Sequence, residues 1–376
     1  MVQYLMSETG RRVCDILDQI SQPTAPFYEN CVAKEIVRLL KNCTTHPEIM
    51  VYSDRYGNIV ANYRHPKADL SASLVTVAHM DHPGFHIESA NEDTAVASIQ
   101  GGLPRDNRLV GLPILIFRNS YSNKGKVTGF IDDNKNSVNV ALESKWDGSV
   151  SNAWAVPDVT RFMIEDDLIH GRSMDDLAGC AQQIAVLEII AREKPAVEYT
   201  AIFTRAEEVG FIGAVGACES GIIPKNAVVI SLEASKNLEG ARPGHGIILR
   251  TGDRQAVFDV MVTELLVKAA ETAQSKGVYH QKKRMDGGTC EAALFMACGY
   301  EAGALAVPLI NYHNHGDSAV EAEAIHKADL AGGVALLLEV ADIMQTEKRI
   351  ARSVFLESRK TAFYKKRNML LKGIVE

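Results

Sequence analysis

The chain has 376 residues, of which 46 % are apolar and 23 % are charged, and its formal net charge is −7. This composition can bury a large core, which excludes a disordered chain, and the length predicts two packed units or one large core with an insertion. The negative net charge argues against a nucleic-acid partner, because nucleic-acid-binding proteins usually present a basic surface.

The seven cysteines are widely spaced and include no C-x-x-C pair. This pattern is typical of reduced thiols in a cytoplasmic protein and argues against a disulfide framework or a cysteine zinc site. The N-terminus lacks the apolar segment of a signal peptide, and no run approaches the roughly 18 apolar residues of a membrane span. We therefore expect a soluble cytoplasmic protein without a membrane partner.

The first half of the chain predicts helices and a strand, followed by a different, β-rich region. Residues 8–20 and 29–42 carry apolar side chains at helical spacing, and the apolar run LVTVA at 74–78 reads as a buried strand that stops at His79. From 87 to 168, short strand-like runs alternate with Gly, Asn and Asp turns. We interpret this region as a small all-β domain inserted into an α/β domain.

An α/β rhythm returns after residue 168. The pattern predicts a helix at 176–193, strands at 199–204, 228–232 and 304–307, and a closing helix at 327–344. The strand at 228–232 is expected to end where Glu233 begins. The predicted fold is α/β, with a mixed, largely parallel sheet flanked by helices, formed by residues 1–86 and 169–346.

The last thirty residues, 347–376, form a basic extension with nine Lys or Arg against three Glu. Apolar and aromatic residues are interleaved with these charges. We predict a helical extension that packs on the body or on a neighbouring subunit. A basic segment for nucleic acid or membrane is the alternative.

Histidines and carboxylates stand just after predicted strands or at helix starts. In open α/β sheets, ligands gather outside the carboxyl ends of the strands, so these groups should converge on one crevice. Imidazoles and carboxylates together suit zinc, cobalt or manganese, and a carboxylate can bridge two cations with its two oxygens. Each motif alone has a simpler explanation, such as a helix cap, so the prediction rests on their joint occurrence. The residues are His79, Asp81, Asp175, Asp176, Glu207, Glu208, Glu233 and His313.

Four runs in this order resemble metallopeptidase family 42, which comprises the glutamyl and deblocking aminopeptidases and the tetrahedral aminopeptidases. The runs are HMDHPGF at 79–85, GRSMDDLAGC at 171–180, FTRAEEVGFIGA at 203–214 and YHNHGD at 312–317, with weaker GHG at 244–246 and DGGT at 286–289. The resemblance covers about residues 8–345. In this family a β-rich domain lies between the first two runs, where the pattern above also places one.

The resemblance implies a role for each matching residue. Asp175 would bridge two divalent metal ions, His79 and Glu233 would complete one site, and Glu208 and His313 would complete the other. It further implies that Glu207 is the general base and that Asp81 orients the imidazole of His79. The family usually has Asp at the position of Glu233 and Arg at that of Leu177, and its G-G-T-D run is altered here to Gly287-Gly288-Thr289-Cys290-Glu291.

His315 is the competing choice for the last metal ligand. We prefer His313 because it directly follows Tyr312 and has Asp317 four positions later. His315 is then expected to line the substrate pocket or to lie just behind the metal ligands. The same is expected of Asp176, Thr289 and Glu291. His82 and His86 are expected to be structural or to face the substrate.

The expected activity is that of a two-metal aminopeptidase that releases N-terminal residues from peptides. The alternatives are a deacylase or carboxypeptidase of the related aminoacylase group, and a metal-binding scaffold without activity. The resemblance also implies a homo-oligomer of up to twelve subunits. An acidic substrate preference would require a basic pocket group, for which Arg172, Arg205, Arg242 and Arg250 are candidates by proximity in the sequence.

Overall fold

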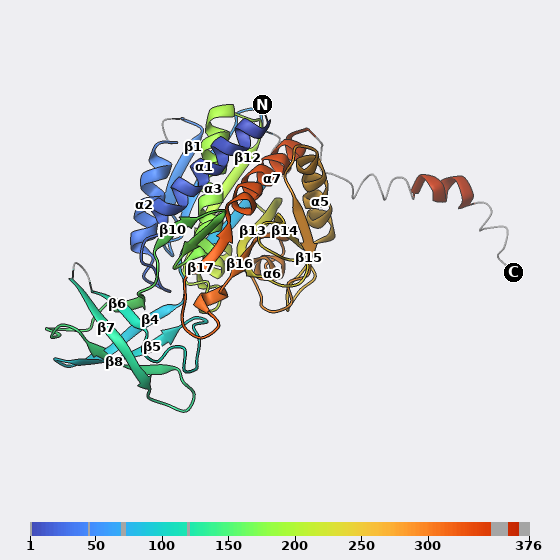
Figure 1. Cartoon of the computed structure of the whole chain (residues 1–376). Helices are drawn as coiled ribbons and strands as arrows, with labels where there is room; N and C mark the ends of the chain where they lie inside the picture. Colours follow the sequence, from blue (N-terminus) through green and yellow to red (C-terminus); the bar gives the residue numbers. More distant parts are fainter. Residues whose placement is uncertain (1, 44–45, 69–72, 119–120, 347–359, 368–376) are drawn as a thin grey trace, which may run out of the picture.

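The computed structural model describes residues 2–43, 46–68, 73–118, 121–346 and 360–367. A large mixed sheet with helices on both faces forms the main body, and a closed six-stranded barrel lies at one end of it (Figure 1). The α/β class expected from the sequence is therefore confirmed. The helices are α1 (Val2–Ile20), α2 (Asn30–Lys41), α3 (Met174–Glu193), α4 (Ile212–Ser220), α5 (Val260–Ser275), α6 (Glu291–Ala297) and α7 (Lys327–Thr346), with a 3-10 turn η1 (Tyr312–Asn314).

The large sheet has a parallel centre with antiparallel strands on both sides. Its main order is β1-β2-β12-β3-β13-β16-β17-β11-β10, and β14 and β15 are attached beside β16. The four central strands β12, β3, β13 and β16 run parallel, so their carboxyl ends lie at one edge. The strands are β1 (Ile49–Ser53), β2 (Ile59–Arg64), β3 (Ser73–His79), β10 (Phe162–Glu165), β11 (Leu168–Gly171), β12 (Glu198–Thr204), β13 (Ala227–Lys236), β14 (Ile247–Arg250), β15 (His280–Lys283), β16 (Glu301–Ile310) and β17 (Glu323–His326).

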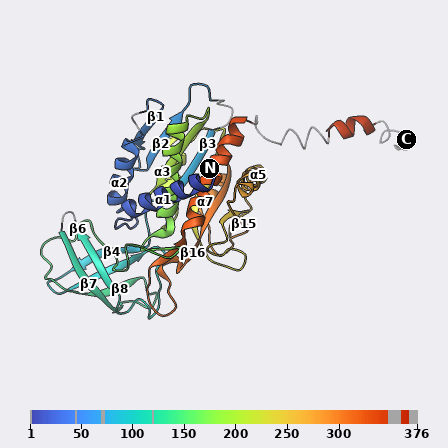
Figure 2. The same cartoon turned by 45° about the horizontal axis from the view of Figure 1, so that its top comes forward.

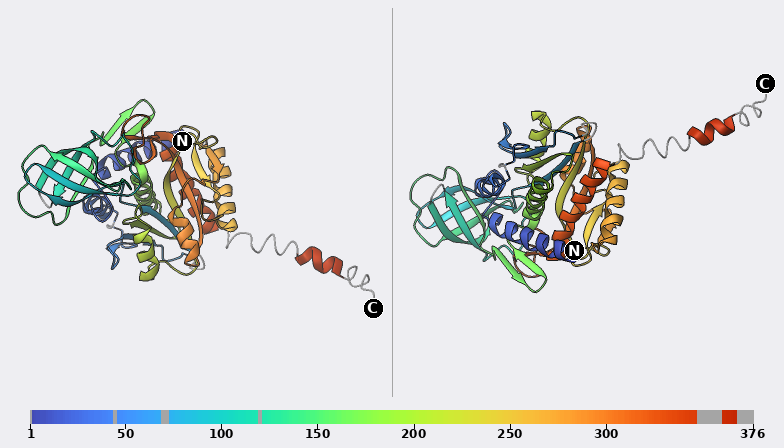
Figure 3. Two further views of the ribbon diagram at one scale, coloured as in Figure 1. Left: turned by 90° about the horizontal axis from the view of Figure 1, so that it is seen from below. Right: turned by 90° about the horizontal axis from the view of Figure 1, so that it is seen from above.

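Two apolar cores hold the helices against the sheet. The larger core joins α1, α2, α3, α5 and α7 to one face, and Figure 3 shows α1 beside α7 on that side. The smaller core joins α4 and α6 to the other face through residues such as Val77, Val229 and Phe295. Every residue of β3 is buried, which fits its continuous apolar sequence at the centre of a covered sheet.

The closed barrel contains β4 (Gly84–Ala90), β5 (Thr94–Gln100), β6 (Pro113–Arg118), β7 (Tyr121–Phe130), β8 (Ser137–Leu142) and β9 (Ala153–Pro157). It has its own apolar core, built from alternate residues of these strands such as Ile114, Ile116, Val138 and Val140. Figure 2 shows it beside the sheet edge that carries the end of β3. The next two strands, β10 and β11, pair with each other, and β11 pairs with β17. Both therefore belong to the large sheet, although they begin inside the window 87–168.

The basic extension is described only in part. Residues 360–367 form a helix that is exposed along its whole length, so this helix does not pack on the body. Residues 347–359 and 368–376 lie outside the described residues, and a contact with a neighbouring subunit stays a prediction. Among the described residues, no helix has the length and apolar composition required to cross a membrane.

Candidate metal centre

The parallel strands deliver the predicted ligands to one edge of the sheet. His79 is the last residue of β3, and the neighbouring strand β12 ends at Thr204, three residues before Glu207. Both strands are pinned by parallel pairing, with Thr204 opposite His79. The side chains that follow these strands therefore start from the same level of the sheet.

Glu233 lies inside β13, which corrects the expectation that this strand ends before it. The pairing of β13 with β3 stops at Ser231, but pairing with β16 continues to Lys236. The strand persists because one neighbour still supplies hydrogen bonds. Continuing the register beyond the Ser231–Val77 pair places Glu233 level with His79, the last residue of β3.

Asp175 stands between two histidines. Its Oδ1 lies 3.5 Å from Nε2 of His79, and its Oδ2 lies 3.5 Å from Nε2 of His313. The latter nitrogen also lies 3.1 Å from Oε1 of Glu208. One carboxylate therefore faces two separate imidazoles with its two oxygens, as a carboxylate shared between two cations would.

His79 joins two groups of possible ligand atoms, one with Asp175 and Glu208 and the other with Glu207 and Glu233. Within each group the ligand atoms all lie within 4.8 Å of one another. Glu233 also accepts a hydrogen bond from Ser231 Oγ at 2.8 Å, and its other oxygen lies 4.0 Å from Nη1 of Arg250.

The electrostatics of this cluster fit bound cations. Asp175 and Glu233 are 3 % and 7 % exposed, and Oδ1 of Asp175 and Oε1 of Glu208 are buried without a hydrogen bond of good geometry. Burial raises the pKa of the Glu207 carboxyl well above its usual range. Several buried carboxylates are costly without compensating positive charge, and imidazole with carboxylate is a donor set that divalent metals accept.

The two imidazoles respond to the same carboxylates. Burial by itself lowers the pKa of His79 and of His313, but neighbouring carboxylates outweigh it and raise both pKa values well above the usual range. For His79 the largest favourable contribution comes from Glu207, and for His313 it comes from Glu208. In the metal-free protein the imidazoles thus carry positive charge that cations would otherwise provide.

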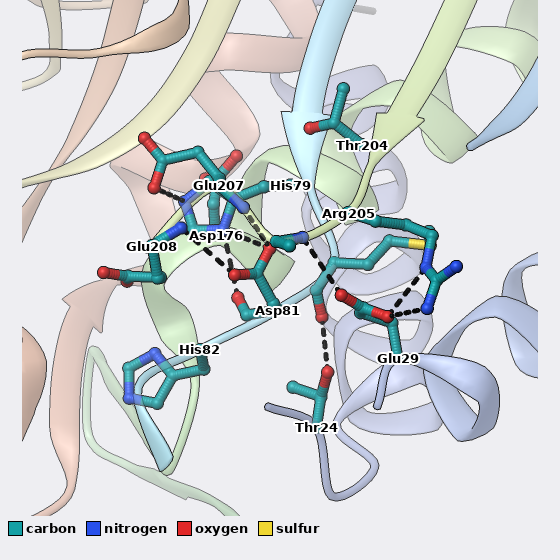
Figure 4. Close-up of polar contacts among 12 residues, drawn as sticks. Thr24, Glu29, His79, Asp81, His82, Asp176, Thr204, Arg205, Glu207 and Glu208 are labelled. Atoms are coloured by element: carbon teal, nitrogen blue, oxygen red, sulfur yellow. Dashed lines mark hydrogen bonds and ion pairs between the residues drawn. The ribbon is translucent and has the colours of Figure 1, made fainter. Parts of the chain in front are cut away.

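Asp81 contacts its neighbours differently from the expectation. Nδ1 of His79 donates to the backbone carbonyl of Asp81 at 3.0 Å, whereas the Asp81 carboxylate is 3.7 Å away. That carboxylate instead accepts the backbone N–H groups of Glu207 and Glu208 at 2.9 and 3.1 Å (Figure 4). The carboxylate therefore orients the segment that carries Glu207 and Glu208, while the backbone carbonyl of Asp81 holds the ring of His79.

His315 lies apart from the cluster. Its Nε2 is 2.9 Å from the carbonyl oxygen of Gly102, and the residue is exposed. His82 is buried and hydrogen-bonds to the carbonyl of Asp175 at 2.7 Å, and His86 to the hydroxyl of Tyr28 at 2.7 Å. The geometry thus favours His313 over His315 as a ligand, and it gives His82 and His86 structural contacts.

The remaining predicted residues surround the cluster without facing the two imidazoles directly. Asp176 is buried and accepts the backbone N–H of Gly179 at 3.1 Å, so it caps the first regular turn of α3. Glu291 is fully buried at the start of α6, where burial raises its pKa to about 8. Thr289 is half-buried in the loop before α6.

The comparison with protein families decides the relationship. The model of the M42 peptidase family, described as M42 glutamyl aminopeptidase, matches residues 150–336. The chain belongs to the M42 family. The matched region contains Asp175, Glu207, Glu208, Glu233, His313 and the last barrel strand β9, while His79 and the other five barrel strands precede it.

Solved structures share the fold of this M42 peptidase. The TET aminopeptidase of a Thaumarchaeota archaeon from marine sediment gives a TM-score of 0.75 at 16 % identity, over 89 % of this chain and 98 % of that one. An aminopeptidase of the archaeon Desulfurococcus kamchatkensis gives a TM-score of 0.73 at 21 % identity, over 91 % of this chain and 96 % of that one. The TET1 peptidase of Pyrococcus horikoshii gives a TM-score of 0.72 at 19 % identity, over 88 % of this chain and 99 % of that one. No curated protein matches the chain.

Glu323 is a site residue of this M42 peptidase that sequence reasoning missed. It is fully buried at the start of β17, and its two oxygens accept the backbone N–H groups of Asp175 at 3.0 Å and His313 at 2.8 Å. It thereby links two residues of the cluster. No sequence signal marks it, because both of its partners are backbone groups far from it in the chain.

The barrel reaches the metal cluster through Gly101 and Gly102, which follow β5. A Cβ atom added to Gly102 would lie 2.1 Å from Nδ1 of His313, and one added to Gly101 would lie 3.2 Å from Cβ of Glu208. Gly101 also has a φ of +79°. Glycines in turns are common, so this close approach is visible only in three dimensions.

Arg250 is the one basic candidate among the four that lies beside the cluster. It is 4 % exposed, approaches Glu233 and donates to Oγ of Ser235 at 3.3 Å. Arg172 donates to the carbonyl of Pro157, and Arg205 pairs with Glu29. Tyr312 also borders the site, where burial and the nearby Asp175 raise its pKa well above the usual range.

Proposed function

We propose that this M42 peptidase is a two-metal aminopeptidase that releases N-terminal residues from peptides, with Glu207 as its general base. The observation that carries the proposal is the position of Asp175, whose two oxygens face two imidazoles inside a cluster of further carboxylates. Family membership supports metal-dependent aminopeptidase activity. The residue roles are those that the resemblance to metallopeptidase family 42 implies, and the distances above support them.

Five residues would hold the ions, with Asp175 shared between two sites. His79 and Glu233 would complete one site, and Glu208 and His313 the other. The contact of His313 with both Asp175 and Glu208 supports the second set. The mutual proximity of His79, Glu207 and Glu233 supports the first and leaves Glu207 beside it. We propose zinc as the metal, with cobalt and manganese as alternatives that share these ligands.

When bound, the divalent ions supply Lewis acidity toward the scissile carbonyl and the attacking water. The chain itself handles the proton. Glu207 would take a proton from the attacking water, and the same carboxyl would then deliver that proton to the leaving nitrogen. Burial raises the pKa of this carboxyl, which moves it toward the range in which one group can both accept and return a proton.

The test of the mechanism is Glu207→Gln. The variant keeps the side-chain shape but cannot accept the proton, so kcat on aminoacyl-anilides should fall by about 10²- to 10⁴-fold. Metal content, measured by elemental analysis, should stay at the wild-type level. Undiminished hydrolysis by the metal-loaded variant would show that Glu207 is not the base.

Two alternatives make different predictions for the substrate. A deacylase or carboxypeptidase of the aminoacylase group would prefer N-acylated amino acids, whereas an aminopeptidase requires a free amine. Release rates from free and N-acylated peptides separate the two. A metal-binding scaffold would hydrolyse neither at full metal occupancy. Neither alternative is favoured by the family match.

We also propose that the chain forms homo-oligomers, that the barrel is an inserted domain making contacts between subunits, and that the protein is cytoplasmic. The TET1 peptidase of Pyrococcus horikoshii can assemble into a tetrahedron or a large octahedral shell, which supports the first of these proposals. Molecular mass in solution, with and without residues 347–376, tests both the assembly and the influence of the basic extension.

A further inference from the structure

The segment between β12 and α4 has an unusual backbone. Ala206 and Phe211 have φ angles of +50° and +59°. These angles lie in the left-handed region, which residues other than glycine seldom adopt. This segment carries Glu207 and Glu208. Residues in such conformations persist only where the surroundings hold them, so the source of the constraint matters for the site.

Side chains from other parts of the chain accept the backbone N–H groups of this segment. Arg205 donates its N–H to Oδ1 of Asn58 at 3.2 Å, and Ala206 donates to Oε1 of Glu29 at 3.0 Å. The next two N–H groups go to the carboxylate of Asp81, as described above. Four consecutive amides are therefore fixed from outside the segment, and Figure 4 shows the carboxylates of Glu29 and Asp81 on either side of it.

Glu29 is held at this position by a complete set of partners. It is fully buried, its Oε1 also accepts the N–H of Phe27 at 2.8 Å, and its Oε2 accepts Nε of Arg205 at 2.8 Å. The guanidinium of Arg205 also donates through Nη2 to the carbonyl of Phe27 at 3.0 Å. A buried carboxylate with these contacts is rigid, and removing one charge would leave the other poorly compensated.

The same N-terminal loop contacts the residue after His79. Oγ1 of Thr24 donates to the carbonyl of Met80 at 2.7 Å, next to Asp81 (Figure 4). The loop before α2 therefore touches both sheet-end segments that carry the cluster. It contributes no side chain to the metal cluster itself among the described residues.

We infer that Glu29, together with Arg205, is a positioning residue for the general base. By fixing the left-handed turn at Ala206, it sets the direction in which Glu207 leaves the backbone. This inference rests on the proposed role of Glu207. It predicts that the ion pair affects the chemical step and leaves substrate and metal binding almost unchanged.

The experiment compares Glu29→Gln with a matched control, Glu188→Gln. Glu188 accepts Nε of Arg12 at 2.8 Å and Nη2 at 2.5 Å, so the control loses a similar Arg–Glu pair, between α1 and α3, remote from the segment. In Glu29→Gln the new amide would face the guanidinium of Arg205, which should release the turn. All measurements use the full-length, metal-loaded protein.

Glu29→Gln should lower kcat by about 10- to 10²-fold, since small misplacements of a catalytic group have effects of this size. Its KM should change by less than about twofold, its metal affinity by less than about threefold, and hydrogen exchange at residues 205–208 should accelerate. Glu188→Gln should keep the wild-type kcat and exchange. Its loss of melting temperature should be smaller, because Glu188 is partly exposed whereas Glu29 is buried. If Glu29→Gln folds poorly, Arg205→Lys replaces it as the test variant. Arg205→Lys retains a cation, so its kcat should be below that of the wild type but above the value expected for Glu29→Gln.

Equal kcat values for Glu29→Gln and Glu188→Gln, measured at a temperature at which both variants are folded, would overturn the inference. Unchanged hydrogen exchange at residues 205–208 in Glu29→Gln would also overturn it. Failure of the proposed function has a different signature. In that case the wild type hydrolyses no peptide, while the exchange comparison still reports whether Glu29 fixes the segment.

Discussion

At the scale of single residues, the site depends on carboxylates that serve the backbone as much as on those that face the cations. Asp81 and Glu323 each accept two backbone N–H groups, from Glu207 and Glu208 and from Asp175 and His313 respectively. Partners of this kind orient ligands and raise metal affinity. They explain how ligands from separated segments are held in one arrangement.

Glu323→Gln tests this at one residue. A glutamine offers one oxygen and one NH₂ group, so one of the two N–H groups of Asp175 and His313 would face a donor. We expect metal affinity to fall by about 10- to 100-fold, the usual effect of losing such a partner. Calorimetric titration of the metal-free protein with zinc measures this affinity.

Glu321→Gln is the control, because Glu321 lies in the same loop but is exposed. It should bind zinc as tightly as the wild type. Equal affinity in the two variants would mean that the buried carboxylate does not organise the site.

At the scale of elements, the barrel and the large sheet meet at the metal cluster. The turn after β5 approaches His313, Nε2 of His315 contacts Gly102, and Arg108 donates to the carbonyl of Gly316 at 3.0 Å. His313 itself has a φ of +54°, between Asn311 and Asn314, which are also left-handed. The barrel thus supports the irregular segment that carries His313, the proposed last ligand.

Gly102→Ala should displace His313, because its Cβ would lie 2.1 Å from the ring, far inside a van der Waals contact of about 3.5 Å. We expect a loss of kcat/KM of roughly 10²-fold or more, together with weaker metal binding. Steady-state kinetics and metal titration measure the two effects.

Gly129→Ala in β7 provides the comparison, since a Cβ there meets nothing within 4 Å. It should behave like the wild type. If Gly102→Ala is equally harmless, the barrel turn is not packed on His313 as the structure indicates.

At the scale of the whole molecule, the charge balance of the site links stability to pH. Burial raises the pKa of Asp81 to about 7 and that of Glu291 to about 8, and carboxylates raise the pKa of both site histidines well above the usual range. All four groups bind more protons in the folded metal-free state than in the unfolded state. Stability is therefore lost as pH rises through these pKa values.

We accordingly predict that the melting temperature of chelator-treated protein falls between about pH 5 and about pH 8. The lowered pKa of Asp175 has the opposite sign, but it acts only below its ordinary value of 3.8. Burial also lowers the pKa of His82, His280 and His315, and these groups oppose the fall below their ordinary value of 6.5. The fall should therefore be steepest above about pH 6.5. Saturating zinc or manganese should raise the melting temperature more at pH 8 than at pH 5, because binding displaces protons. Scanning calorimetry checks both statements, and a metal-induced increase that does not grow with pH would contradict them.

The sequence by itself determined the α/β rhythm, the buried strand β3, the β-rich region and the order of the proposed ligands. Periodicity and the position of polar residues after apolar runs are local properties, so they can be recognised from the sequence alone. Only the tertiary structure decided that Glu233 lies inside β13, that β10 and β11 join the large sheet, and that His313 rather than His315 faces Asp175. It also supplied Glu29, Gly102 and Glu323, whose importance comes from backbone groups and rings distant in the chain. Such contacts leave no periodic signal, because they arise only when the parallel strands bring their ends to a common edge.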